Sequence, residues 1–361
     1  MLTIIDMGAS IEPRLPPTAD LASAIGRRAA RAALRSGDHV SVRRGAIVPS
    51  MPADRHWQEA EAHALAMIAS VHSKLHNGAA FSHASAALLH GLWVLNVPER
   101  PEVSQRTRPN MHAKSSLWRH HARLTNDDVT TLAGLRVTTL ERTIADCART
   151  MSPRDALAVA DSGMRAILRA DRRTRAADAA RLAELRRRLR QLVDTGPPRG
   201  RRQARAVLAA ADPYAESPME TVLRWIAVSR GLPPPEVQMP VHTREKTFYV
   251  DLGWRWVVRR PDGSTVVVVV LLEYDGEVKY VPGDGLVDSL DDAVAAVMAE
   301  KRREDLIREA PDTTLRRFTK RDVFDPDRAF ARMLAAIPHE VRAELTPVPE
   351  LLYGTALRPR S

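Results

Sequence analysis

The sequence contains a single cysteine, Cys147, among its 361 residues. One thiol can form neither an intramolecular disulfide nor a cysteine-rich zinc module, and such a chain is typical of a reducing, intracellular compartment. Long apolar segments are also missing, because the longest strongly apolar run, residues 266–272, is far below the roughly 20 residues that span a bilayer. The first residues have no basic start and no apolar stretch of signal-peptide length. We therefore expect a cytoplasmic protein that is neither secreted nor inserted into a membrane.

Lysine and aromatic residues are scarce as well. Only six Lys accompany 48 Arg, aromatic residues make up 4%, and the formal net charge is +10 with a pI near 10.3. Guanidinium groups match phosphate in a planar, bidentate geometry, so this balance favours a nucleic acid as partner. An Arg- and Ala-rich chain is also what a GC-rich genome encodes, and composition alone leaves that explanation open.

The positive charge is concentrated in residues 165–205, which contain 14 Arg, no Lys and four acidic residues. Apolar residues recur there at steps of three and four, which predicts an amphipathic helix. Its apolar stripe is formed by Leu182, Leu185, Leu189 and Leu192. Its other faces carry Arg186, Arg187, Arg188 and Arg190. Two interpretations stay open: clustered Arg that displaces counterions from a nucleic-acid backbone, or a solvated helical linker between two domains.

The N-terminal segment begins with residues 1–20, which contain three prolines and no helical period and predict a loose arm. A helix is predicted from Asp20 to about Arg35, with Asp20 as N-cap and Gly37 as the stop. Residues 40–48 then predict a short hairpin. Its tip carries Arg43 and Arg44. A helix followed by a basic hairpin is typical of the second half of a winged helix, whose wing contacts phosphate. A small capping subdomain is the alternative, because the preceding helices of a winged helix are not visible.

The next region mixes helices and strands. Residues 60–95 have a helical pattern. Strand-like pieces follow near residues 101–106, 116–124 and 135–137. Thr138 and Glu141 form a capping box that opens a helix through Cys147, which we expect to be a packing residue. Five histidines in this region have no convincing metal-ligand spacing beside a carboxylate. They are His83, His90, His112, His120 and His121.

Short motifs in the same region carry a resemblance to a known family. They are Ser82-His83, Ser85-Ala86-Ala87, Leu89-His90-Gly91-Leu92, Val137-Thr138-Thr139, Arg142-Thr143 and Asp146. With these motifs, residues 20–165 resemble the actinobacterial AbiEi-type antitoxin, or transcriptional-regulator, domain. The resemblance implies a winged-helix DNA-binding start and a helix-rich body for regulation or toxin neutralisation. It suggests a cognate toxin as a protein partner.

Residues 213–340 have a different organisation. Ser217 as N-cap, Pro218 at the first position and Glu220 as capping-box partner predict the start of a helix. Strand-like stretches follow at residues 236–242, 247–258 and 265–274. Then come a helix over residues 290–308, a strand over 313–318 and a last helix opened by Asp325-Pro326. The predicted order of elements is αβββαβ, followed by one more helix.

The loop over residues 260–264 sets the register of two of these strands. Pro261 suits the second position of a turn, and Gly263 suits a left-handed residue in a three-residue hairpin loop. With that loop, Asp251 lies directly opposite Glu273, and Asp275 joins the same face. A two-residue turn would instead place Asp251 opposite Tyr274, on the wrong face.

The three acids on one face repel each other and need an offsetting charge. A hard divalent cation with oxygen ligands, Mg²⁺ or Mn²⁺, is the natural candidate. Val269 and Leu271 lead the chain to Glu273, which places the acids at the rim of a core. The alternative is an exposed strand end with ordinary solvated acids, where Asp275 only begins a turn.

A second set of motifs follows this order along the chain. It consists of Ser217-Pro218 with Glu220, Tyr249-Val250-Asp251, Glu273-Tyr274-Asp275-Gly276, Arg303-Glu304 and Arg317-Phe318. With it, residues 213–335 resemble the PD-(D/E)XK restriction-endonuclease-like superfamily, most closely an uncharacterised bacterial branch related to the very-short-patch mismatch-repair endonuclease. By this resemblance Asp251 and Glu273 are metal ligands, Glu220 supports the metal or its water, and Asp275 occupies the place of the superfamily's Lys.

Three basic residues add to this set, Lys279 as a candidate catalytic residue and Arg303 and Arg317 as candidate nucleic-acid contacts. Lys279 stands where the branch usually has His, three residues after its Gly. A compact ammonium group there could hold a water or the scissile phosphate, or could be a solvated loop side chain. Arg303 and Arg317 would contact the backbone phosphate.

The sequence therefore predicts a multidomain α+β protein. Its predicted parts are an arm and degenerate winged-helix segment (1–55), an AbiEi-antitoxin-like helix-rich domain (56–165), an Arg-rich helical linker (166–212), a restriction-endonuclease-like domain (213–340) and a tail (341–361). The predicted function is a Mg²⁺- or Mn²⁺-dependent DNA endonuclease or nickase associated with the nucleoid. The alternative is a non-enzymatic DNA-binding regulator or type IV antitoxin-like protein that retains a nuclease fold. A second copy of the chain is a further candidate partner, since cleavage of both strands needs two active sites.

Overall fold

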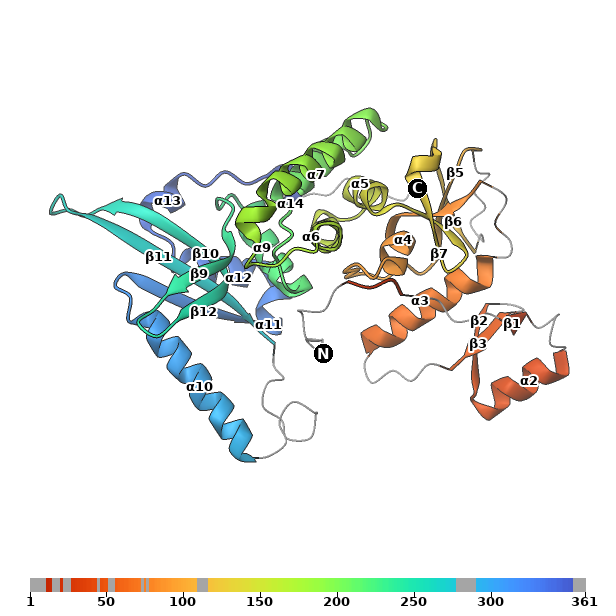
Figure 1. Cartoon of the computed structure of the whole chain (residues 1–361), viewed down its shortest axis with the longest axis horizontal. Helices are drawn as coiled ribbons and strands as arrows, with labels where there is room; N and C mark the ends of the chain where they lie inside the picture. The colour runs from red at the N-terminus through yellow and green to blue at the C-terminus, as the bar shows by residue number, and fades with distance from the viewer. Residues whose placement is uncertain are drawn as a thin grey trace.

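The structure is a computed structural model that describes residues 11–14, 20–21, 27–43, 46–50, 56–72, 75, 78–108, 116–276 and 290–352. These residues form a mixed α+β protein with three sheets (Figure 1). The predicted α+β class is confirmed. Most of the predicted N-terminal arm and the end of the predicted tail lie outside the described residues, as do Arg44, His112 and Lys279.

A small three-stranded sheet has one strand before the helix of residues 27–36 and two strands after it. The elements are β1 (Asp20–Leu21), α2 (Arg27–Ser36), β2 (His39–Arg43) and β3 (Ala46–Pro49). The hairpin is confirmed, and α2 ends before Gly37, whose φ of +81° suits a residue without a side chain. The prediction of Asp20 as an N-cap was wrong. Asp20 is extended in β1 and pairs with Ile47, because Asp20–Leu21 adds an edge strand to β3.

The second sheet contains five strands in the order β6-β5-β4-β8-β7. They are β4 (Ala80–Phe81), β5 (Glu102–Gln105), β6 (Trp118–His121), β7 (Val129–Leu132) and β8 (Leu135–Thr138), with a short 3-10 turn η1 (Asn126–Asp128) before β7. The predicted helical stretch over 60–95 is two helices, α3 (His56–His72) and α4 (His83–Leu89), with β4 between them. A Cβ on Gly91, which follows α4, would lie 2.0 Å from the Glu12 carbonyl oxygen, so the described part of the arm passes closely there.

Four helices connect this sheet to the C-terminal half. They are α5 (Leu140–Thr150), α6 (Pro153–Leu168), α7 (Arg175–Thr195) and α8 (Arg201–Ala210). The cap of α5 is Thr139 and not Thr138, since the Thr139 hydroxyl accepts a hydrogen bond from the Arg142 backbone N at 3.4 Å. Cys147 is fully buried, as expected of a packing residue.

The Arg-rich residues 166–212 are mainly helical, as predicted, in α7 and α8 with a break over residues 196–200, and one side of α7 is buried. Leu185, Leu189 and Val193 are fully buried in a core that also contains residues of α5, α6 and α8 and of the C-terminal sheet. The apolar side of α7 therefore packs into the core that the neighbouring helices and the C-terminal sheet share. Most of its arginines are exposed, whereas Arg175 is half-buried and contacts the Val237 carbonyl.

The third sheet carries the C-terminal half, in the order β12-β11-β10-β9. The elements are α9 (Pro218–Ser229), β9 (Glu236–His242), β10 (Thr247–Arg259), β11 (Thr265–Asp275), α10 (Leu290–Arg308) and β12 (Thr313–Thr319), followed by α11 (Lys320–Val323), α12 (Pro326–Leu334), α13 (His339–Ala343) and α14 (Pro349–Leu352). The predicted order αβββαβα is confirmed, but α11, α13 and α14 were not predicted, and α12, predicted as the last helix, is followed by two more. The described part of the predicted tail is packed, because Leu351 is 2% exposed and its carbonyl accepts from the Trp225 indole N at 2.9 Å.

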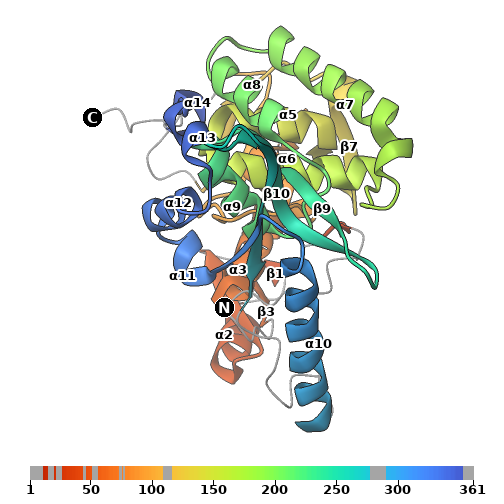
Figure 2. The same ribbon diagram turned by 90° about the vertical axis from the view of Figure 1, so that its left-hand side faces the viewer.

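Two helices cover opposite faces of this sheet. Along β11, Val270 and Leu272 belong to the core beside α9, whereas Leu271 between them belongs to a cluster with Ile307 of α10. Figures 1 and 2 show α10 across the strands from α9. Strands β9 to β11 are antiparallel, and β12 returns parallel to β11 after α10.

We predict that Leu189→Ala lowers the free energy of unfolding by about 2–5 kcal/mol, because it opens a cavity in a closely packed core. The exposed Arg190→Ala on the same helix is the matched control and should leave stability nearly unchanged. Denaturant unfolding followed by circular dichroism measures both. Equal, small effects would show that α7 is a solvated linker.

Candidate functional site

The β10–β11 hairpin has the register that the sequence predicts. The Arg260 backbone N donates to the Ser264 carbonyl at 2.8 Å, and Gly263 has a φ of +85°. The ladder runs from Arg259 opposite Thr265 to Leu252 opposite Leu272. The next position along the strands places Asp251 opposite Glu273.

The row of side chains continues across the sheet. On β12, Arg317 pairs with Glu273 in the parallel ladder. The Asp251 carboxylate accepts a hydrogen bond from the Tyr274 backbone N at 2.8 Å, which fixes the carboxylate at the edge of this row. Glu273 is only 8% exposed, so the acids lie at the rim of a core and not on an open strand end.

Glu220 reaches the site from α9. The Ser217 hydroxyl accepts from the Glu220 backbone N at 3.1 Å, which confirms the predicted N-cap. The Glu220 carboxylate accepts from the Glu216 backbone N at 2.9 Å and from the Gln238 side-chain amide at 3.1 Å. Burial, together with the charge of Glu216, raises the pKa of Glu220 to about 7.

Asp251 lies in an environment with an excess of negative charge. Its pKa is raised well above the usual range, first by burial and then by repulsion from Glu220 and Glu273. A positive charge placed near Asp251 would stabilise the ionised form of its carboxyl group.

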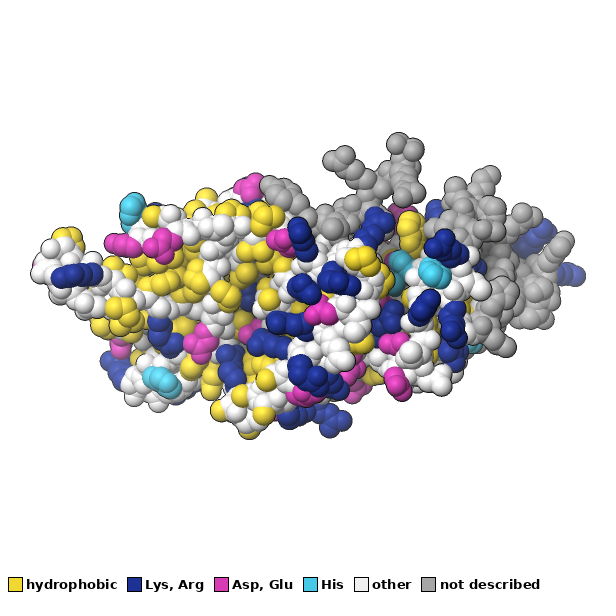
Figure 3. Space-filling view, turned by 90° about the horizontal axis from the view of Figure 1, so that it is seen from above, with side chains coloured by type: hydrophobic (Ala, Val, Ile, Leu, Met, Phe, Trp, Pro, Cys, Tyr) yellow, Lys and Arg dark blue, Asp and Glu magenta, His cyan; other side chains and the backbone are white. Residues whose placement is uncertain are grey.

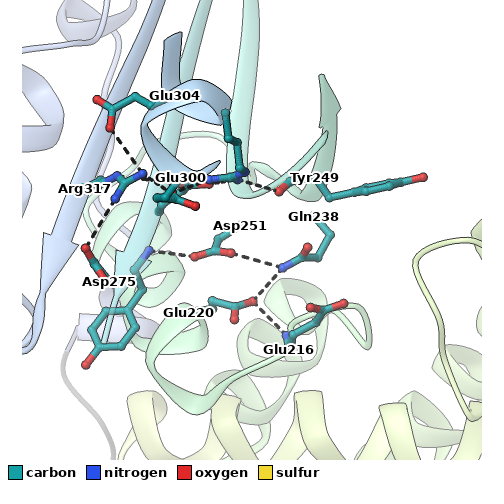
Figure 4. A network of polar contacts seen from close by, with 12 residues as sticks. Glu216, Glu220, Gln238, Tyr249, Asp251, Asp275, Glu300, Glu304 and Arg317 are labelled. Carbon is teal, nitrogen blue, oxygen red and sulfur yellow. Dashed lines mark hydrogen bonds and ion pairs between the residues drawn. The ribbon is translucent and has the colours of Figure 1, made fainter. Parts of the chain in front are cut away.

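Two arginines occupy the space between these acids. Arg303 of α10 contacts both carboxylate oxygens of Glu273, one of them at 3.2 Å, and donates to Glu300 at 3.1 Å. Arg317 contacts Glu300 and lies 3.6 Å from the Asp275 carboxylate (Figure 4). The sequence predicts phosphate contacts for both arginines, and the structure places both against carboxylates of the site. The two arginines supply part of the positive charge that the sequence predicts from a bound cation.

These residues line a pocket of about 220 Å³. The lining consists of Asp251, Glu273, Tyr274, Asp275, Glu300, Arg303 and Arg317. With all four carboxyl groups ionised, four carboxylates face two guanidinium groups, a formal excess of two negative charges. Glu220 does not line the pocket, and its charge affects Asp251 from outside the pocket by raising the pKa of Asp251.

The residues that could hold a divalent cation with part of its water shell are Asp251 and Glu273, and both carboxylate oxygens of Glu273 also contact Arg303. Among the described residues, no group of three or more His, Cys, Asp or Glu side chains is arranged to hold a metal ion. Mg²⁺ is commonly held by one or two carboxylates and several waters. Asp251 and Glu273 can supply that pair, and the excess charge of the pocket equals the charge of one such ion.

Gln238 is part of this site, and sequence reasoning missed it. It is 3% exposed in β9, and its side-chain N donates to Glu220 and, at 3.4 Å, to Asp251. The only signal in the sequence is a polar residue in an otherwise apolar stretch of strand. That signal is too common to identify a site.

The predicted nucleic-acid contacts lie elsewhere on the surface. Figure 3 shows Lys and Arg side chains gathered on the face that carries α7. The exposed residues there include Arg186, Arg187, Arg188 and Arg190. Two of them have acidic neighbours, because Arg187 pairs with Glu184 at 2.7 Å and Arg188 lies 3.4 Å from Glu141. Arg43 is the last residue of β2.

Comparisons of this chain with known proteins found one solved structure of low similarity. No family model matches the chain, and no curated protein matches it. Among solved structures, the crystal structure of the RV2827C protein from Mycobacterium tuberculosis is similar, with 13% identity, coverage of 59% of this chain and 83% of that chain, and a TM-score of 0.33. So low a TM-score carries no argument about fold or function. No helix among the described residues is long and apolar enough to cross a membrane.

We predict that metal-free protein loses stability as pH rises toward neutrality, in part through Glu220. Its carboxyl ionises near 4.5 in the unfolded chain and at about 7 in the folded one. Its contribution to the free energy of unfolding is therefore fully present below pH 4.5 and lost as pH rises to about 7.

Urea denaturation in EDTA across this range measures the effect. Glu220→Gln should flatten the fall relative to wild type, whereas Glu344→Gln, at an exposed position, controls for the loss of one carboxyl. Parallel pH profiles of wild type and Glu220→Gln would contradict the prediction.

Proposed function

We propose that the protein is a Mg²⁺-dependent DNA endonuclease or nickase of the PD-(D/E)XK type. The observation that carries this proposal is the placement of Asp251 and Glu273 opposite each other on adjacent strands, at a pocket with excess negative charge. Two carboxylates at this spacing support a cation at a phosphodiester.

Each side chain of the site has a role in this proposal. Asp251 and Glu273 hold Mg²⁺, which supplies a Lewis acid and a water of lowered pKa for hydrolysis of the phosphodiester. Glu220, with its pKa of about 7, supports Asp251 and responds to the protonation state of the site near neutral pH. Arg303 and Arg317 are within the pocket lining and can exchange their carboxylate contacts for the oxygens of a phosphate. Lys279 lies outside the described residues, and its proposed contact with water or phosphate rests on sequence alone.

DNA binding is assigned to two other surfaces. The exposed Arg face of α7 would neutralise backbone phosphates, and the hairpin after α2, whose first strand ends at Arg43, would act as the wing of a degenerate winged helix. Arg44 lies outside the described residues, and its contact with phosphate rests on sequence alone. By the resemblance to the AbiEi-type domain, residues 20–165 would bind DNA or a cognate toxin. The arginines of these two surfaces would then position the carboxylate pocket on the duplex.

A plasmid-nicking assay with Mg²⁺ tests the catalytic half of the proposal. Asp251→Asn and Glu273→Gln should each reduce nicking by at least about 100-fold, the scale for losing one electrostatic group at a reaction centre. Asp262→Asn, at the exposed tip of the same hairpin, is the matched control and should cut like wild type. Cutting that persists in both site variants, or no cutting by wild type with Mg²⁺ or Mn²⁺, would exclude the nuclease.

The DNA-binding half predicts a salt dependence. Replacing Arg186, Arg187, Arg188 and Arg190 together with Gln should weaken DNA binding. The slope of log affinity against log salt should also fall by about 0.9 for each phosphate that the variant no longer neutralises. The same four positions changed to Lys keep the charge and should retain most of the slope. An unchanged slope in the Gln variant, measured by fluorescence anisotropy, would place the DNA on another surface.

A non-enzymatic regulator is the second candidate, and one observation favours it. Arg303 contacts both oxygens of Glu273, which is the arrangement of a structural ion pair. Asp275 also stands in the place of the superfamily's Lys. In that case the nuclease fold serves only to bind DNA or a partner. DNA binding that survives EDTA and Asp251→Ala, without any cutting, would identify this function.

A further inference from the structure

Gln238 has a backbone conformation that is rare for its residue type. Its φ of +50° lies in the left-handed region, where a side chain is sterically disfavoured. The flanking pairs keep one register, which makes Gln238 the cross-strand neighbour of Asp251. These pairs are Val237 with Leu252 and Met239 with Val250. Strain of this kind persists only where the surroundings impose it, and it gathers at functional sites.

At Gln238 and Asp251 the side chains of both strands change from one face of the sheet to the other. Val237 and Leu252 belong to the core beside α9, whereas Met239 and Val250 belong to the cluster beside α10. Gln238 and Asp251 lie between them, where both strands change from one core to the other. This position allows Gln238 to reach Glu220 on α9 and Asp251 on β10 with one side chain.

The contacts of Gln238 fix the orientation of its carboxamide. Its Oε1 accepts from Arg172 at 3.2 Å, while its Nε2 donates to Glu220 at 3.1 Å and to Asp251 at 3.4 Å (Figure 4 shows the two contacts to the acids). A guanidinium group only donates, so the amide oxygen faces Arg172 and the amide nitrogen faces the two acids.

Arg172 is itself held in place from two sides. Its Nη1 lies 2.8 Å from each carboxylate oxygen of Glu216, and its guanidinium stacks 4.8 Å from the centre of the Tyr249 ring. It lies in the connection between α6 and α7. The orientation of the amide is thus set by a residue outside the pocket.

We propose that Gln238 is the positioning residue of the carboxylate site. Its amide group holds Asp251 in the orientation that binds the divalent cation and keeps Glu220 at a fixed place behind it, and Arg172 prevents the amide from turning over. Gln238 does not line the pocket, so it acts through Asp251 and not on the substrate. The inference rests on the proposed function, because it concerns the same site.

Calorimetric titration of Mn²⁺ into the full chain tests the inference without DNA. Gln238→Met keeps the length of the side chain and removes both donors. It should weaken Mn²⁺ binding about 10- to 100-fold, the usual effect of losing a group that orients a metal ligand. Circular dichroism and the thermal midpoint in EDTA establish that the variant is folded.

Arg172→Met supplies a second variant, which leaves Gln238 in place and frees its amide to turn. It should weaken Mn²⁺ binding in the same direction, and the double variant should be no weaker than Gln238→Met alone, because Arg172 acts through Gln238. Arg173→Met, at the exposed neighbouring position, is the matched control and should bind Mn²⁺ like wild type. A merely structural role would give additive losses.

The outcomes separate this inference from the proposed function. Mn²⁺ binding that is unchanged in folded Gln238→Met, or losses that add in the double variant, would overturn the inference alone. Binding that follows the expected pattern in a protein that cuts no DNA would support the inference and overturn the proposed function. No Mn²⁺ binding by wild type would overturn both.

Discussion

The register of the β10–β11 hairpin is the constraint on which the site depends. A slip of one residue would turn every side chain of one strand to the other face and separate Asp251 from Glu273. The three-residue loop with Gly263 at a φ of +85° excludes that slip, because a two-residue turn needs a different backbone path. Once this register is set, the pairing with β9 and β12 aligns Gln238, Asp251, Glu273 and Arg317 in one row across four strands.

Charge balance within this row explains why the site supports two candidate functions. Arg303 and Arg317 neutralise part of the acidic charge and allow Glu273 to be buried, since a buried charge without a partner is strongly destabilising. Two negative charges remain at the pocket, and the raised pKa of Asp251 reports the same excess. A divalent cation would offset both charges, whereas protonation of Asp251 would offset one of them.

The position of Glu220 depends on a buried ion pair far from the pocket. Arg224 of α9 pairs with Asp161 of α6, and their side chains are 3% and 0% exposed. The Thr221 hydroxyl also donates to Asp161 at 2.7 Å. Removing one partner of such a pair leaves an uncompensated charge in the core. Helix α9 is therefore fixed to helices that precede the predicted nuclease region, and a single core joins α5 through α9 to the C-terminal sheet.

The sequence by itself determined the local elements of the C-terminal half. Ser217 and Pro218 fix where α9 begins, and the turn chemistry at Pro261 and Gly263 fixes the hairpin, because caps and turns depend on neighbouring residues. The sequence also identified Asp251 and Glu273, since a hairpin register follows from its loop. It could not find Gln238, nor the carboxylate contacts of Arg303, because these depend on strands and helices that meet only in the folded chain. Likewise the sequence predicted Asp20 as the N-cap of a helix, and only the pairing with Ile47 shows that Asp20 belongs to a strand. Tertiary structure decided which core the apolar side of α7 joins, because an apolar stripe shows that a partner exists and not which elements supply it.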